Sequence, residues 1–202
     1  MRLEIYADIL CPWCYIGKRR LSRALDGLAE PPEIVWRSFE LDPEADRTPG
    51  PTAEEAMRRW WGERAPARTE LIRTTGAADG LELNLHLARP VSTFDAHRLW
   101  KLGQEHGKGE ETMERLLRAY HTEGANIADP EVLDALREEV LPGRALPAGA
   151  YAERVREDER RAAAQGVAGV PSLVIDGGRP VSGVQPPEAI RRLLDEGARR
   201  GG

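Results

Sequence analysis

The sequence contains very few cysteines: Cys11 and Cys14, both in the stretch CPWC, are the two thiols of a 202-residue chain. A stabilising disulfide should close a long loop, because the entropy it removes from the unfolded chain grows with loop length. A bridge across four residues would constrain that chain very little. A chain of this size also buries roughly 70% of its unfolded surface, so its core needs no disulfide. We therefore expect these two thiols to serve chemistry.

Long hydrophobic runs are also missing. No uninterrupted apolar stretch approaches the ~18 residues that a membrane-spanning helix requires. The N-terminal segment lacks the apolar region of a secretory signal, because Glu4 and Asp8 interrupt it. We therefore expect a cytoplasmic protein without a membrane partner. Ordinary thiols are kept reduced in the cytosol, so a close cysteine pair there is expected to be catalytic, redox-sensing or metal-binding.

The chain has no excess of basic charge. Its 34 acidic side chains outnumber its 29 lysines and arginines, and the formal net charge is -5. This balance gives no electrostatic reason to bind nucleic acid or anionic lipid. We therefore predict no nucleic-acid partner. Composition leaves the oligomeric state open.

The N-terminal part predicts a β-α-β arrangement. Apolar and polar residues alternate over residues 3–7, which is typical of a short strand. From Pro12 onward, apolar residues recur at helical spacing, which predicts a helix. The two prolines at 31–32 mark its end. Residues 33–41 are rich in β-branched and aromatic side chains, which favour a second strand.

The remainder of the chain predicts a helical block followed by a β-β-α arrangement. The predicted helices of this block cover residues 52–61, 92–104, 112–121, 130–140 and 148–165. Ser92 and Asp95 have capping-box spacing, so Ser92 is predicted to cap the second of these helices. Residues 166–183 predict a hairpin and residues 186–197 a closing amphipathic helix. This order predicts an α+β domain, within the broad α/β class, that a helical insertion interrupts.

The position of Cys11 predicts a reactive thiol. If a helix begins after Leu10, Cys11 is its N-cap and Pro12 its first residue, where a missing N–H costs nothing. The N–H groups of Trp13 and Cys14 would then be free to stabilise a thiolate at Cys11, with help from the helix dipole. Cys14 lies one turn further on, within disulfide reach, so we predict that Cys11 is the nucleophile and Cys14 the resolving thiol.

A metal site is the weaker interpretation of the CPWC stretch. A structural zinc ion needs four ligands, and the chain has no second pair of this kind. The four histidines also lack the i, i+4 spacing that presents two imidazoles on one helix face. We therefore predict no metal. Each of these histidines is expected to be solvated or hydrogen-bonded, with the role of His97 left open.

Six stretches resemble a known family in their order along the chain. They are YADILCPWCYIGKRRL, WRSFELDP, STFDAHRLWKLG, AYHTEGANIADPEVL, GVAGVPSLVI and VSGVQP. Together they are similar to the DsbA-like thioredoxin-fold oxidoreductases, and within them to the cytosolic FrnE-like branch. The resemblance implies a thioredoxin-like domain formed by residues 1–43 and 166–202, with an inserted all-helical domain formed by residues 44–165.

The resemblance also implies a substrate-binding loop. Thioredoxin-fold families carry a cis-proline facing the active-site helix, and Pro171 matches that position, although an ordinary X-Pro bond is cis only about 5% of the time. A cis bond would turn the Val170 backbone toward the sulfur, where an extended substrate could pair with it. Pro12 and Trp13 are expected to shape the same surface. The family's Asn before TFDAHRL is replaced here by Ser92, to which no catalytic role is transferred.

We therefore predict a thiol:disulfide oxidoreductase that exchanges disulfides with protein or small thiol substrates through Cys11 and Cys14. No cofactor is required, and glutathione can serve as a co-substrate. Two alternatives stay open. One is a glutathione-dependent isomerase or transferase of the same fold, a branch that typically has a serine where this chain has Cys11. The other is a non-enzymatic, chaperone-like binding module.

Overall fold

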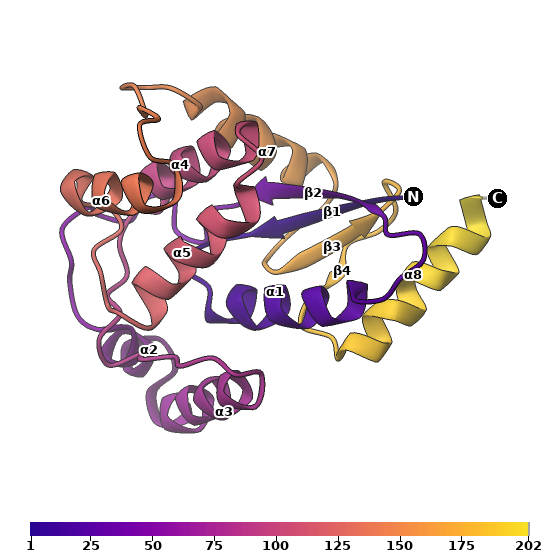
Figure 1. The fold of residues 1–202 in the computed structure, drawn as a ribbon. Helices are drawn as coiled ribbons and strands as arrows, with labels where there is room; N and C mark the ends of the chain where they lie inside the picture. The colour runs from indigo at the N-terminus through magenta and orange to yellow at the C-terminus, as the bar shows by residue number, and fades with distance from the viewer. Residues whose placement is uncertain (202) are drawn as a thin grey trace.

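A four-stranded mixed sheet forms the centre of the part of the chain that the computed structural model describes, residues 1–201 (Figure 1). The strand order is β2-β1-β3-β4. The strands are β1 (Arg2–Ala7), β2 (Glu33–Ser38), β3 (Ser172–Ile175) and β4 (Val181–Ser182). β1 pairs parallel with β2 and antiparallel with β3, and β4 pairs antiparallel with β3. The predicted α/β class with a helical insertion is confirmed.

Helices cover both faces of this sheet. α1 (Pro12–Leu25) and α8 (Pro187–Gly201) pack together on one face, while α7 (Ala152–Ala164) contacts β2 on the other (Figure 1). β1 is consequently buried along its length after Arg2. The predicted strand is present, and its polar residue Glu4 is also buried, with a hydrogen bond from Arg161 of α7.

The insertion between β2 and β3 is helical, as predicted. Besides α7, it contains α2 (Ala53–Trp61), a 3₁₀ turn η1 (Gly62–Arg64), α3 (Ala65–Ala78), α4 (Phe94–Glu105), α5 (Gly109–His121) and α6 (Pro130–Val140). Thr52 and Glu55 form a reciprocal capping box at the start of α2. The predicted cap at Ser92 is wrong, because α4 begins one residue later, with Thr93 in the N-cap position. The proposed domain limits at 43/44 and 165/166 stay a prediction.

One hydrophobic core runs from the sheet into the insertion. Leu99 and Trp100 of α4 pack with Leu116 and Leu117 of α5, and all four are fully buried. Gly103 allows the two helices to approach closely, because a Cβ atom there would collide with the side chain of Thr112. The hydrophobic core of the insertion is therefore continuous with that of the sheet.

Charged residues of α1 also join it to the insertion. Glu114 of α5 accepts hydrogen bonds from Lys18 at 2.9 Å and from Arg19 at 2.8 Å. Asp79, directly after α3, pairs with Arg20 at 2.7 Å. The basic face of α1 lies opposite its apolar face, and it thus holds α3 and α5 against this helix.

A charged cluster with buried carboxylates joins the far face of the sheet to α4 and α7. We define this charged cluster as Glu4, Arg37, Lys101, Asp158 and Arg161. Glu4 accepts hydrogen bonds from Arg37 at 2.8 Å and from Arg161 at 2.9 Å. Asp158 accepts hydrogen bonds from Arg37 at 2.9 Å and from Lys101. Every charge of this cluster therefore has a partner of opposite sign.

Candidate active site

Cys11 lies at the start of α1, in the position that the sequence predicted. β1 ends at Ala7, and the turn that follows is closed by a 3.2 Å hydrogen bond from the Cys11 N–H to the Asp8 carbonyl. Cys11 is the N-cap, with φ -88° and ψ 112°, and Pro12 is the first helical residue. Proline suits that place because its N–H would have no helical partner and its φ is already helical.

The contacts of the Cys11 sulfur differ from the expectation. The Cys11 side chain makes no capping hydrogen bond to the helix. The N–H of Cys14 bonds to the Cys11 carbonyl at 3.0 Å, so the prediction that this N–H is free to stabilise the sulfur is wrong. The Sγ of Cys11 instead donates to the carbonyl of Val170 at 3.6 Å.

Cys14 is the more enclosed of the two thiols. Its residue is 1% exposed, against 4% for Cys11, and both cysteines are unbridged. The N–H of Asp8 donates to the Cys14 sulfur at 3.5 Å. Burial, followed by hydrogen bonding to Cys11 and the charge of that neighbour, raises the pKa of Cys14 well above its ordinary value. The inner thiol is thus held in its protonated form.

The loop before β3 faces this pair. The Val170–Pro171 peptide bond is cis. Pro171 lies against Gly17 of α1, where an added Cβ atom would stand 3.0 Å from the proline Cγ and 2.9 Å from the Gly183 carbonyl oxygen. The Pro171 carbonyl also accepts a 2.8 Å hydrogen bond from Gly183. A glycine at position 17 therefore permits the close approach of this loop to the active-site helix.

A buried carboxylate lies beneath the turn. Asp8 is fully buried and accepts hydrogen bonds from the N–H of Leu41 at 2.8 Å and of Leu10 at 3.4 Å. Its Oδ1 lies 3.2 Å from Nε2 of His97, which is also fully buried. His97 belongs to α4, so this contact joins a helix of the insertion to the buried Asp8 side chain beneath the turn.

A second buried histidine supports the same turn. Nε2 of His121, the last residue of α5, donates to the Ile9 carbonyl at 2.9 Å. Burial lowers the pKa of His121 to about 4, so the ring is neutral. Nδ1 of His121 and Nδ1 of His97 are buried without a hydrogen-bond partner in the part of the chain that the structure describes.

Sequence reasoning missed Asp8 and His121 as residues of the site. Asp8 had appeared only as a polar interruption near the N-terminus, although its place three residues before Cys11 was a local signal. His121 is separated from Cys11 by more than a hundred residues, so no local pattern could connect them. Only the packing of α5 against the turn brings His121 there.

A cavity of about 500 Å³ opens beside Cys11. The thioredoxin-like part contributes Cys11, Pro12, Trp13 and Val170 to its wall, so the predicted site residues other than Cys14 and Pro171 meet there. The insertion contributes an apolar surface and several polar side chains. Its contributions include Met57, Trp60, Trp61, Arg68, Ile72, Leu85, Tyr120 and His121. The cavity thus has Cys11 on one wall and helices of the insertion on another.

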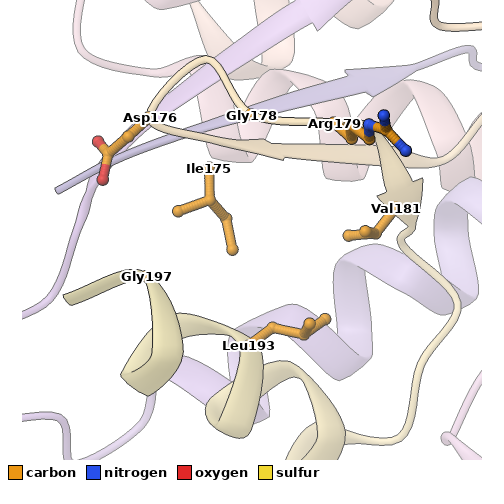
Figure 2. A pocket seen from close by; sticks show the side chains of 7 residues that line it. All are labelled: Ile175, Asp176, Gly178, Arg179, Val181, Leu193 and Gly197. Carbon is orange, nitrogen blue, oxygen red and sulfur yellow. The ribbon is translucent and has the colours of Figure 1, made fainter. Parts of the chain in front are cut away.

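A second cavity, of about 480 Å³, lies between the β3–β4 hairpin and α8 (Figure 2). Figure 2 shows Ile175 and Val181 on the hairpin and Leu193 on α8 around this space, with Asp176 and Arg179 set apart along the hairpin. No cysteine or histidine is among the described residues that line it. The cavity beside Cys11 is therefore the candidate active site.

Neither a metal cluster nor a membrane span emerges from residues 1–201. No group of three or more histidine, cysteine, aspartate or glutamate side chains in this range is placed to hold a metal ion. No helix in the same range is both long and apolar enough to cross a membrane.

The comparisons with known proteins identify the family. Residues 2–195 match the family model of the DSBA-like thioredoxin domain, and the chain belongs to this family. A probable DsbA oxidoreductase of Streptomyces coelicolor, SCO1869, is 34% identical, with a TM-score of 0.88 over 98% of this chain and 89% of that one. An uncharacterized Bacillus subtilis protein, YwbO, is 27% identical over 81% of this chain and 78% of its own length.

A more distant structure shares the fold. The cytosolic disulfide reductase DsbM of Pseudomonas aeruginosa is 19% identical, with a TM-score of 0.69 over 98% of this chain and 99% of that one. A second structure of DsbM is a complex with GSH. At this level of identity the likeness shows a common fold, and it leaves substrates to be argued from the residues themselves.

Proposed function

We propose that this chain is a thiol:disulfide oxidoreductase in which Cys11 is the nucleophile and Cys14 the resolving thiol. One observation carries the proposal: the two sulfurs differ in accessibility. Cys11 lies on the wall of a cavity, whereas Cys14 is buried behind it with a raised pKa. An exchange enzyme needs this asymmetry, because the outer sulfur must react with the substrate first. The inner sulfur must stay unreactive until the mixed disulfide has formed.

The first step begins from the reduced protein. The Cys11 thiolate attacks one sulfur of a substrate disulfide, forms a mixed disulfide with it, and releases the other half of the substrate as a thiolate. The Val170 carbonyl lies 3.6 Å from the Cys11 sulfur, and this proximity supports a role of the Val170 backbone in pairing with an extended substrate. Pro12 and Trp13 complete the contact surface.

The second step releases the product. Cys14 loses its proton and attacks the Cys11 sulfur, which breaks the mixed disulfide and expels the second substrate thiolate. The substrate has then gained two electrons, and the protein holds a Cys11–Cys14 disulfide. Two thiol molecules, such as glutathione, regenerate the dithiol and become a disulfide themselves. The same steps in reverse oxidise a dithiol substrate.

We place this activity in the cytoplasm, without a bound cofactor. The disulfide of the protein is the electron carrier, so no further redox group is needed. Glutathione keeps thiols reduced in the cytosol, so it is the proposed co-substrate that regenerates the dithiol. Protein and small-molecule disulfides are the proposed partners.

Insulin reduction by wild type, Cys11→Ser and Cys14→Ser tests this function. Cys11→Ser should lose about 1000-fold or more of the rate, because removal of a nucleophile removes the covalent path. Cys14→Ser should still form a mixed disulfide with the substrate but should release it slowly. Activity in Cys14→Ser equal to that of wild type would favour a glutathione transferase or isomerase instead. Client protection that persists after both substitutions would favour a chaperone-like module.

A further inference from the structure

We propose that the cavity beside Cys11 selects substrates in which an apolar side chain adjoins the reacting cysteine and a carboxylate lies close by. The inference rests on the proposed function and adds a substrate class to it. The apolar side chain would enter between α2 and α3, and the carboxylate would pair with Arg68. Both helices belong to the insertion, which thereby acts as a specificity element for the cysteine pair.

The position of Cys11 fixes where the occupant must attach. Cys11 lies on the cavity wall, next to Pro12 and Val170. A substrate sulfur that reacts there brings the atoms bonded to it to the mouth of the same cavity. The volume of about 500 Å³ lies within the range of small-ligand sites and is large enough for an aromatic side chain. The occupant is therefore a group covalently linked to the substrate sulfur.

The lining of the cavity favours an apolar occupant. Met57 and Ile72 from α2 and α3, together with Leu85, are buried around it. The indoles of Trp60 and Trp61 continue this apolar surface toward solvent. Trp60 is 60% exposed and Trp61 is 37% exposed. Exposed large apolar side chains that border a cavity mark a binding surface, because they gain burial when a ligand arrives. Glutathione, whose cysteine is flanked by a γ-linked glutamate and a glycine, would leave this surface uncovered.

Arg68 adds a requirement for negative charge. Its guanidinium stacks on the Trp61 ring, 4.6 Å from the centroid, at the rim of the apolar surface. No carboxylate lies within ion-pair distance of Arg68 among residues 1–201. Asp42 is the other charged residue of the lining, and it disfavours a second carboxylate on its own part of the wall. The charge pattern therefore fits one carboxylate placed toward α3.

Peptide mixed disulfides with mercaptoethanol test the inference. The first peptide has phenylalanine next to its cysteine and then glutamate; the second has glycine in place of phenylalanine; the third has glutamine in place of glutamate. Glutathione disulfide and bis(hydroxyethyl) disulfide are the unselective references. Release of the peptide thiol by the reduced protein is followed by chromatography, and kcat/KM is compared among wild type, Trp61→Ala and Arg68→Gln.

Two variants serve as matched controls. Leu71→Ala removes an exposed apolar side chain from α3 that does not line the cavity, and Arg64→Gln removes an exposed arginine just before α3. Wild type should prefer the phenylalanine peptide to the glycine peptide by about 10- to 100-fold. Trp61→Ala should lose about 10-fold of this preference. Arg68→Gln should lose about 2- to 5-fold of the preference for glutamate over glutamine, and added salt should reduce that preference in wild type.

The two reference disulfides distinguish failure of the cavity assignment from failure of the proposed function. The control variants Leu71→Ala and Arg64→Gln should reduce bis(hydroxyethyl) disulfide at the wild-type rate, because neither side chain lines the cavity. Equal kcat/KM for the phenylalanine and glycine peptides, equal or faster use of glutathione disulfide, or a preference that survives Trp61→Ala would each overturn the cavity assignment alone. A wild-type protein that reduces none of these disulfides would overturn the proposed function, and the cavity assignment with it.

Discussion

Two groups of polar residues meet neighbouring turns of α4, the charged cluster at Lys101 and the residues beneath Cys11 at His97, and they differ in how completely their buried atoms are paired. In the charged cluster beneath α7, Glu4 and Asp158 each accept hydrogen bonds from two cationic side chains. Beneath Cys11, by contrast, both histidines keep a buried nitrogen without a described partner, and a thiol is held protonated by burial.

The difference separates structural from chemical roles. Burial raises the pKa of Glu4, but hydrogen bonds from Gln165, Arg37 and Arg161 outweigh it and lower the value to about 2. That carboxylate is fixed in one charge state and holds elements together. The histidines beneath Cys11 each keep a buried nitrogen without a described partner, so their rings are held by fewer contacts than the Glu4 carboxylate.

The largest effect on stability is expected from the charged cluster. Asp158→Ala would leave Lys101 buried without its carboxylate, which should lower the free energy of unfolding by about 3–5 kcal/mol. Glu153→Ala is the control, because its partner Arg160 and Glu153 itself are both exposed and such pairs contribute less than about 1 kcal/mol. Urea unfolding measures both changes. Equal losses in the two variants would remove the structural role assigned to the cluster.

Acid unfolding should be shaped by His121. Its folded pKa of about 4 lies below the ordinary value of 6.5, so its contribution is complete above pH 6.5 and is lost as pH falls through about 4. The loss amounts to about 3 kcal/mol. His121→Gln keeps a donor for the Ile9 carbonyl and should remove that part of the pH dependence, whereas exposed His86→Gln should not. Unchanged pH dependence in His121→Gln would argue against a buried neutral ring.

Gly17 tests the approach of the Pro171 loop to α1. Gly17→Ala places a Cβ atom against the Gly183 carbonyl and the proline ring, and such overpacking costs about 1–3 kcal/mol, partly offset by the helix propensity of alanine. We expect a net loss near 1 kcal/mol together with slower disulfide exchange. Gly50→Ala, which meets open space, should change neither the stability nor the exchange rate. Faster exchange in Gly17→Ala would contradict the role of this contact.

The smallest effect concerns Glu40, which lies between the two groups. Burial and then a hydrogen bond with Glu159 raise its pKa to about 8. A raised folded value means that its contribution to stability is complete below about pH 4.5 and is lost as pH rises through 8. Glu40→Gln should therefore unfold less readily than wild type at alkaline pH. The gain should stay below about 1 kcal/mol, because the carboxyl group is partly exposed. A variant less stable than wild type there would rule out this pair.

The sequence predicted the parts of the fold that rest on local pattern. The strand-to-cysteine turn and the N-cap at Cys11 both depend on neighbouring residues. α3 was not predicted, because its apolar residues are few and do not form one clear helical face. Its place is set by tertiary contacts with α1 and α2.

The site was predictable only in part, for the same reason. The cysteines and their proline form a contiguous motif, so chemistry could be assigned to them directly. His97 and His121 reach the turn through contacts between distant segments. The cavity needs both the turn and helices of the insertion, and no local periodicity describes such a junction.

Alkylation by iodoacetamide, with each cysteine resolved by peptide mass, tests the asymmetry of the two sulfurs most directly. In the folded, reduced protein at neutral pH we predict that Cys11 is modified first, and that Cys14 reacts only when the chain is unfolded. Modification of Cys14 at the same rate as Cys11, or before it, would contradict the assignment of nucleophile and resolving thiol.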